Sequence, residues 1–276
     1  MAGLTLALDP RLADMGEFGP LPWETSRLRG PPVDGARSMS LDHGMMSGVD
    51  VTALEREVYS EADAAEILRV APSTLHWWLE GRKQGTKVYP PVIRPEPTGS
   101  RSLTWAEFVE AALLRQYRRE LQVRLQEIRE FVTTLRAETG VQYPLAHYQP
   151  WVGEGCRLLL EMQQRSQLPG ELWLVAPASD QIVLTDPAAS FLKRIEWTDD
   201  LPAAWKPHDD DSSPVRCQPT MRFGLPSIGG ISTEVIVEHL DGGEDAEEVA
   251  QQFGLTIDDV HWARSYELSR RTPAAA

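Results

Sequence analysis

A break between two short helical patterns constrains the fold of this chain more than any other feature. Residues 60–68 and residues 73–80 each repeat apolar side chains three and four positions apart, as the buried face of a helix requires. These side chains are Ala64, Ile67 and Leu68 in the first pattern and Leu75, Trp78 and Leu79 in the second. Ser60 is the expected N-cap of the first helix, and Ser73 is that of the second. Because Pro72 cannot continue a helix, the chain turns there, and we predict a helix-turn-helix.

A strand-like segment and two longer helical patterns follow. Residues 81–102 are rich in Gly, Pro, Val, Tyr and basic residues, which indicates an extended hairpin. Thr104 and Glu107 form a predicted capping box at the start of a long helix, and a further amphipathic helix ends at Gly140. We therefore assign residues 57–140 to one domain, the head, in which the hairpin follows the helix-turn-helix as a wing.

Strand and helix signals alternate in residues 141–200, which we call the middle region. Residues 157–162, 171–175 and 181–185 have the composition of strands, and a short helix is expected from residue 187 to residue 197. We therefore expect a small mixed region of strands and helix here, and an α+β fold for the whole chain.

Two polar segments and a helical domain make up the rest of the chain. Residues 1–56 are rich in Gly, Pro, Asp and Met, and we expect a disordered or loosely attached arm, in which Met45 or Met46 offers an alternative translation start. Residues 201–216, with consecutive aspartates and several prolines, are expected to form a solvated acidic linker. Residues 217–268, the tail, show three helical patterns separated by glycines, which predict a compact helical bundle.

Charge is segregated along the sequence. The net charge is −14, which opposes contact with DNA phosphates unless positive charge is concentrated locally. Residues 73–119 hold eight basic and four acidic side chains, a balance of +4. Residues 199–276 hold fifteen acidic and six basic side chains, a balance of −9. The head is therefore suited to nucleic acid, and the tail to a different partner.

Composition and spacing argue against several classes of protein. No apolar run approaches the roughly 18 residues that span a membrane, and the first residues lack the basic segment of a signal peptide. Cys156 and Cys217 are too few for a disulfide framework, so a reducing cytoplasm is expected. The histidines lack metal-ligand spacing, and no glycine loop suits a phosphate. We therefore expect a cytoplasmic protein that is not an enzyme and uses no metal or cofactor.

Nine residues of the head are candidates for DNA contact. If the apolar face of the second short helix is buried, its opposite side faces outward. Small polar side chains and free N–H groups at a helix N-terminus suit the major groove, and basic side chains on the hairpin suit the DNA backbone. The candidates are Ser73, Thr74, His76 and Trp77 on the helix, and Arg82, Lys83, Lys87, Arg94 and Arg101 on or after the hairpin.

Three segments of the head carry a family resemblance. Residues 59–68 read YSEADAAEIL and residues 70–75 read VAPSTL, followed by Trp78, while residues 103–108 read LTWAEF. These segments resemble the opening helices and the helix after the wing in MerR-type winged helix-turn-helix domains, which implies DNA binding. The chain departs from such regulators in two ways, because the domain does not begin the chain and no long dimerising coiled coil follows Gly140.

The tail carries a second resemblance. Residues 222–233 read RFGLPSIGGIST and, with residues 240–244 and 249–255, resemble a small antitoxin-like domain. A MerR-like head joined to this tail is similar to VapB-type antitoxins of toxin–antitoxin modules. The resemblance implies a protein that neutralises a PIN-like ribonuclease toxin and represses its own operon by binding double-stranded DNA at its promoter. We also expect a homodimer.

Two other functions stay open. One is a stand-alone MerR-like transcription regulator whose C-terminal half binds a ligand or a protein, and the other is an interaction protein that keeps the head as a scaffold. A PIN-like reading frame beside the gene favours the antitoxin. Asp258 and Asp259 begin the last predicted helix and would repel phosphates, so we expect the tail to contact protein and not DNA.

Overall fold

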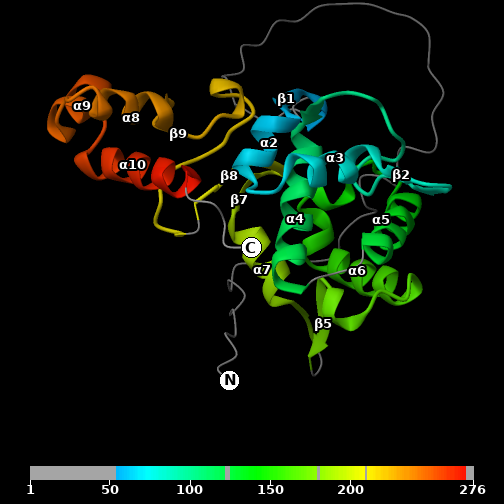
Figure 1. The fold of residues 1–276 in the computed structure, drawn as a ribbon. Helices are drawn as coiled ribbons and strands as arrows, with labels where there is room; N and C mark the ends of the chain where they lie inside the picture. The colour runs from blue at the N-terminus through cyan, green and yellow to red at the C-terminus, as the bar shows by residue number, and fades with distance from the viewer. Residues whose placement is uncertain (1–53, 122–124, 179–180, 209, 272–276) are drawn as a thin grey trace, which may run out of the picture. The chain divides into compact units, whose positions relative to one another are not determined.

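The fold is mixed α+β, as predicted (Figure 1). The computed structural model describes residues 54–121, 125–178, 181–208 and 210–271. In these residues the strands pair as five separate antiparallel sheets of two strands each. The predicted N-terminal arm lies outside the described residues except for residues 54–56. Leu54 is already part of the hydrophobic core, with 4% of its surface exposed, so ordered packing begins before residue 57.

The two short helices that the sequence predicts are present at the start of the head. They are α2 (Glu61–Ile67) and α3 (Pro72–Glu80). The Ser60 hydroxyl accepts a hydrogen bond from the Asp63 N–H at 3.1 Å, which confirms Ser60 as the N-cap of α2. Ser73 does not cap α3, because that helix begins one residue earlier at Pro72. The fixed φ of proline suits the first helical position, where no N–H partner is needed.

A hairpin, a pair of strands and two long helices complete the head. They are β2 (Arg82–Gln84) with β3 (Lys87–Tyr89), β1 (Glu57–Ser60) with β4 (Ser102–Thr104), α4 (Trp105–Leu121) and α5 (Leu125–Thr139). The hairpin is thus shorter than the predicted span of residues 81–102. The capping box of α4 is confirmed, because the Glu107 N–H donates to the Thr104 hydroxyl at 3.2 Å and the Thr104 N–H donates to the Glu107 carboxylate at 3.0 Å.

One predicted strand of the middle region is a helix. Residues 157–162 lie in α6 (Glu154–Arg165), which packs against α5. Leu159, Met162 and Gln163 are buried together, and this spacing of three and four is that of a helix face. A short run of consecutive apolar residues fits a strand and a buried helix equally well in sequence, so packing decides between them.

The other predictions for the middle region are partly correct. The remaining elements are the 3₁₀ helices η3 (Pro144–Ala146), η4 (Gln149–Trp151) and η5 (Gly170–Leu172), the strands β5 (Val175–Ala178), β6 (Gln181–Leu184) and β7 (Ile195–Thr198), and the helix α7 (Asp186–Lys193). Strand β6 forms where it is predicted and pairs with β5. Residues 171–175 are a strand only at Val175. Helix α7 ends at Lys193 and not at residue 197, because the chain enters β7.

The predicted solvated linker begins as a buried strand. Residues 201–205 form β8 (Leu201–Trp205), which pairs with β7, and Leu201, Ala204 and Trp205 are buried. The prediction fails because the aspartates that follow dominate the local composition, while the partner strand is only apparent in three dimensions. An acidic connection is left only beyond Trp205.

A single hydrophobic core extends through the head and the middle region. Most of its buried side chains come from residues 54–205. The Trp105 indole N–H donates to a backbone carbonyl of β8 at 2.6 Å. Phe108 lies edge-on to Trp205, with the ring centres 6.3 Å apart. Gly140 is therefore not a domain boundary, and the head and the middle region form one unit.

The tail forms the predicted helical bundle around a core of its own. Its helices are α8 (Thr233–Asp241), α9 (Ala246–Phe253) and α10 (Ile257–Arg271), and its core includes Val215, Ile236, Val249, Val260 and Tyr266. The tail contacts the head, because the Tyr59 hydroxyl donates to the Gly224 carbonyl at 2.5 Å and Arg270 pairs with Glu66 at 2.7 Å.

Replacing Trp205 with Ala is expected to destabilise the head and the middle region together. The side chain is 2% exposed, and loss of a buried aromatic ring costs about 3–5 kcal/mol. Urea unfolding followed by circular dichroism should show the transition of this unit move to lower urea. Val183→Ala, at a position that is 41% exposed, should change the free energy of unfolding by less than about 0.5 kcal/mol. If the urea transition of the head in Trp205→Ala stays where it is in wild type, the head and the middle region do not share one core.

Candidate nucleic-acid interface

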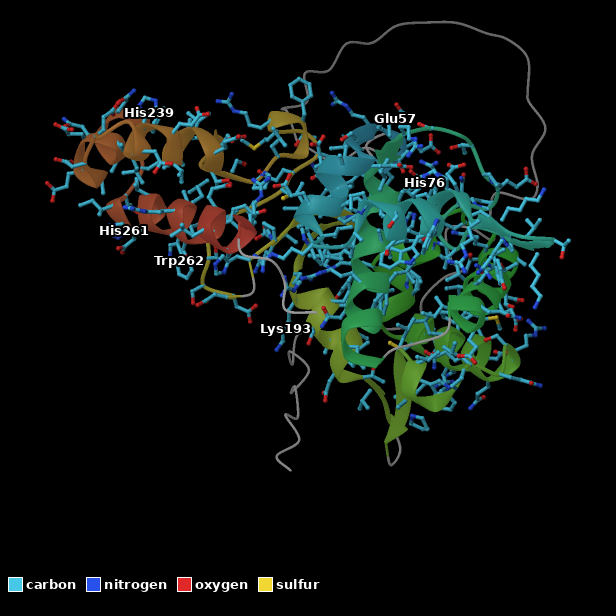
Figure 2. All side chains as sticks on the ribbon, in the orientation of Figure 1. Glu57, His76, Lys193, His239, His261 and Trp262 are labelled. Atoms are coloured by element: carbon cyan, nitrogen blue, oxygen red, sulfur yellow. The ribbon has the colours of Figure 1, made fainter. Side chains whose placement is uncertain are left out.

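Helix α3 buries one side and presents the other to solvent. Its buried side chains are Leu75, Trp78 and Leu79, each 0% exposed, as predicted. On the other side, Ser73 is exposed, Trp77 is 40% exposed, and Thr74 and His76 are half-buried. Figure 2 shows His76 on this helix. The first turn of α3 contains no acidic residue, so nothing in that turn repels a phosphate.

The hairpin is fixed to the end of α3. Gly81 joins the two with a φ of +71°, and a Cβ atom there would lie 2.3 Å from the Tyr89 carbonyl oxygen, so only glycine fits. The Arg82 guanidinium lies 4.7 Å from the centre of the Trp77 ring and 5.6 Å from that of Tyr89. These are cation–π contacts. Through them Arg82 holds the hairpin against the exposed side of α3.

Two lysines of the hairpin carry accessible positive charge. Lys83 and Lys87 are both exposed, on the two strands that Gly85 and Thr86 connect. Neither lysine forms an ion pair within the ranges that the structure describes. Their ammonium groups are therefore available to a ligand of opposite charge.

The prediction that Arg94 contacts DNA is wrong. Its side chain is only 2% exposed, and its guanidinium pairs with Glu80 and, at 2.8 Å, with Glu107. It also donates to the Ser102 carbonyl at 2.7 Å. A basic residue that follows a hairpin is ordinarily expected to be exposed. The sequence does not show that Glu80 and Glu107, on two different helices, enclose Arg94 in the folded chain.

Glu61 joins two other candidates. Its carboxylate lies 2.9 Å from His76 Nδ1 through one oxygen and 2.7 Å from the Arg101 guanidinium through the other. The Glu61 side chain is 8% exposed, whereas that of Arg101 is 75% exposed. Sequence reasoning missed Glu61, because the residues that it joins are far apart along the chain and a glutamate in a first helical turn is ordinarily exposed.

An exposed aromatic side chain marks a loop of the tail. Phe223 is 77% exposed in Met221–Leu225, which we call the Phe223 loop. Arg222 and Phe223 both have left-handed backbone, with φ of 49° and 53°, which costs a non-glycine residue roughly 1–2 kcal/mol. Hydrogen bonds hold the loop, including that from the Tyr59 hydroxyl to the Gly224 carbonyl. The surrounding structure therefore fixes a strained backbone that presents a phenyl ring to solvent.

A metal site and a reactive thiol are two features that would bear on catalysis in the described residues. No three His, Cys, Asp or Glu side chains among them lie close enough together to hold a metal ion. Burial raises the pKa of the Cys217 thiol to about 12, which leaves it unreactive. No helix in the described ranges is both long and apolar enough to cross a bilayer.

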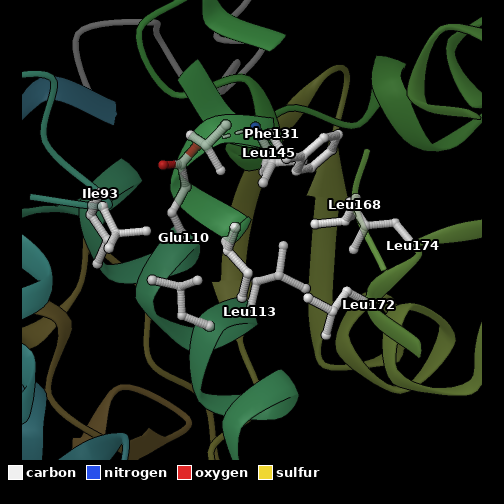
Figure 3. A pocket seen from close by; sticks show the side chains of 12 residues that line it. Ile93, Glu110, Leu113, Phe131, Leu145, Leu168, Leu172 and Leu174 are labelled. Carbon is white, nitrogen blue, oxygen red and sulfur yellow. Dashed lines mark hydrogen bonds between the residues drawn. The ribbon is translucent and has the colours of Figure 1, made fainter. Parts of the chain in front are cut away.

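A small cavity lies against α4 and α5, and Figure 3 shows its lining. Its volume is about 20 Å³, room for roughly one water molecule, whereas sites for small effectors measure about 300–1,000 Å³. The lining is apolar except for Glu110, which accepts from the Leu145 N–H at 3.2 Å and lies 3.3 Å from Arg136. Burial raises the pKa of Glu110 to about 7, against the effect of Arg136.

Glu110 should make the stability of the fold depend on pH. An unfolded glutamate loses its proton near pH 4.5, whereas the buried one keeps it up to about pH 7. The contribution of Glu110 to the free energy of unfolding is therefore fully present below about pH 4.5 and is lost as the pH rises to about 7. Glu110→Gln should remove this loss of stability. The free energy of unfolding of the variant minus that of wild type should therefore rise by about 1–3 kcal/mol from pH 5 to pH 8.

Urea unfolding at several pH values measures this difference. The matched control is Glu138→Gln, because Glu138 is 48% exposed and pairs with Arg165 at the surface. That variant should follow the wild-type pH profile closely. A difference between Glu110→Gln and wild type that stays constant from pH 5 to pH 8 would contradict the proposed protonation of Glu110.

Comparison with known proteins gives a relative by sequence and a solved structure of similar fold. No family model matches the chain. The uncharacterized protein Rv2308 of Mycobacterium tuberculosis is 29% identical over 242 residues, which cover 83% of this chain and 100% of that protein. The crystal structure of Rv2018 from Mycobacterium tuberculosis has a TM-score of 0.61 at 26% identity, and covers 76% of this chain and 98% of its own. The chain is therefore similar in architecture to a solved protein over most of its length.

Proposed function

We propose that this chain is a regulator that binds double-stranded DNA, including its own promoter, through α3 and the β2–β3 hairpin. The observation that carries the proposal is the pairing of an accessible helix N-terminus with a basic hairpin fixed beside it. The resemblance of the head to MerR-type winged helix-turn-helix domains supports the same function.

The two parts of this surface suit different contacts with DNA. Ser73, Thr74, His76 and Trp77 are near the N-terminus of α3, the part of a recognition helix that reaches base edges in the major groove. Lys83 and Lys87 extend from the hairpin, where ammonium groups suit phosphates. Arg82 supports the hairpin through Trp77, so its part in DNA binding is to hold the lysines beside the helix.

Reversing the charge of Lys83 and Lys87 together should weaken binding to all DNA sequences alike. Each lost phosphate contact lowers the slope of log affinity against log salt by about 0.9, so the double change should lower it by about 2. Fluorescence anisotropy of the full chain with a labelled promoter duplex, titrated at several salt concentrations, measures both effects. Lys193→Glu, on α7, is the control and should leave affinity and slope unchanged (Figure 2). An unaltered slope in the double variant would remove the hairpin from the interface.

The tail favours a second function, the binding of a protein partner. The resemblance of the tail to an antitoxin-like domain implies that this partner is a PIN-like ribonuclease toxin. We propose that the chain acts in the cytoplasm as a homodimer that neutralises this toxin. The physical observation in favour is the Phe223 loop, because a strained backbone that exposes an aromatic ring is typical of a contact site. The acidic first turn of α10, with Asp258 and Asp259, disfavours DNA as its ligand.

Phe223→Gly should separate partner binding from stability. Glycine adopts a φ of 53° without strain, so the variant should unfold at the same or a higher urea concentration than wild type. It should bind promoter DNA normally but fail to rescue growth when co-expressed with the proposed PIN-like ribonuclease partner. Leu268→Ala, at another exposed apolar position (55%), is the control and should still rescue. Full rescue by Phe223→Gly would exclude this loop as the toxin contact.

The cavity beside Glu110 does not offer an effector site to the alternative function, a stand-alone, ligand-sensing regulator. Within the described residues the cavity beside Glu110 holds only about one water molecule, too little for an effector. A regulator that responds to a protein through its tail stays consistent with the same features, and the rescue experiment distinguishes it from an antitoxin.

A further inference from the structure

Three elements of the head converge on one carboxylate. Glu61 is the first residue of α2, His76 is on α3, and Arg101 lies just before β4. Besides the two side-chain contacts already described, the Glu61 N–H donates to the Arg101 carbonyl at 2.8 Å. Glu61 is thus held in place by its backbone and by both carboxylate oxygens, and it holds the His76 ring in turn.

This arrangement fixes which nitrogen of His76 carries hydrogen. A carboxylate only accepts hydrogen bonds, so the 2.9 Å contact with Glu61 places a hydrogen on Nδ1, while the Arg101 guanidinium, which only donates, lies further from that nitrogen at 3.5 Å. The neutral ring then has no hydrogen on Nε2, which becomes an acceptor. Nε2 makes no hydrogen bond to the described part of the chain, and 33% of the His76 side chain is exposed.

We infer that His76 reads a base through Nε2 as a hydrogen-bond acceptor, and that Glu61 is the positioning residue that sets this choice. The inference rests on the proposed DNA binding. In the major groove the hydrogen-bond donors are adenine N6 and cytosine N4, whereas guanine and thymine present only acceptors, and adenine presents an acceptor at N7 beside its donor. His76 should therefore prefer an adenine or a cytosine at one position of the binding site.

The test begins with the full wild-type chain and a pool of duplexes with a randomised core. Sequences that the chain enriches define a preferred duplex, and fluorescence anisotropy then measures its affinity for that duplex and for every single base-pair variant. His76→Ala should lose discrimination at one base pair, where wild type prefers adenine or cytosine by about ten-fold, and keep the other preferences. His76 is half-buried, and in this variant Glu61 keeps its hydrogen bond from Arg101, so a thermal melt must show that the variant is folded.

Glu61→Gln tests the positioning role. The carboxamide nitrogen can donate to His76 Nδ1, which moves the ring hydrogen to Nε2 and turns that nitrogen into a donor. The preference at the same base pair should then move away from cytosine, which presents no acceptor, and toward guanine or thymine. Glu66→Gln is the control, because Glu66 is also on α2 but is 56% exposed and pairs with Arg270, and its base preferences should match wild type.

The outcomes separate the inference from the proposed function. If the wild-type chain enriches no duplex, it is not a sequence-specific DNA-binding protein and the inference falls with that function. If it enriches a duplex but His76→Ala keeps every preference, DNA binding stands and His76 is not a base contact. A His76-dependent preference for guanine or thymine in wild type, or a uniform loss of affinity in Glu61→Gln without a shift in preference, would also overturn the inference.

Discussion

The burial of the Arg94 guanidinium between two carboxylates is the interaction on which the arrangement of α3 and α4 depends. A buried cation is costly unless it is paired, and removal of one partner of such a pair typically costs about 3–5 kcal/mol. Glu80 at the end of α3 and Glu107 in the first turn of α4 supply the opposite charges. Partial burial acts to raise the pKa of Glu80, but hydrogen bonds from the Gly99 N–H and from Arg94 lower it overall, so the pair stays ionised. All of these groups must be in place together, which fixes α3 against α4.

This network also explains why the head depends on the middle region. The Tyr143 hydroxyl donates to Glu107 at 2.9 Å, and the Leu145 N–H donates to Glu110 one turn further along α4. Trp105 and Phe108, on the same helix, contact β8. Helix α4 therefore presents its polar groups and its rings to residues beyond position 140. The middle region supports a rigid surface on α3, and rigid support is what precise contact with a ligand requires.

The tail is joined to this frame close to α2. Burial raises the pKa of Tyr59 well above its usual value, so its hydroxyl stays protonated and can donate to the Gly224 carbonyl. A Cβ atom at Gly224 would lie 2.5 Å from the Val58 side chain, so only glycine allows β1 and the Phe223 loop to approach this closely. The exposed ring of Phe223 is therefore held by a contact with the strand that leads into α2.

The sequence by itself determined the elements whose signals are local. Apolar spacing gave the buried faces of α2 and α3, Ser60 and the Thr104–Glu107 box placed helix starts, and glycines separated the helices of the tail, because caps and periodicity act within one turn. Only the tertiary structure decided that residues 157–162 are helical, that residues 201–205 are a buried strand, and that Arg94 faces two carboxylates and not solvent. Those outcomes depend on partners distant in sequence. For the same reason the contacts of Glu61 were not apparent from the sequence, because only the folded chain brings His76 and Arg101 to its carboxylate.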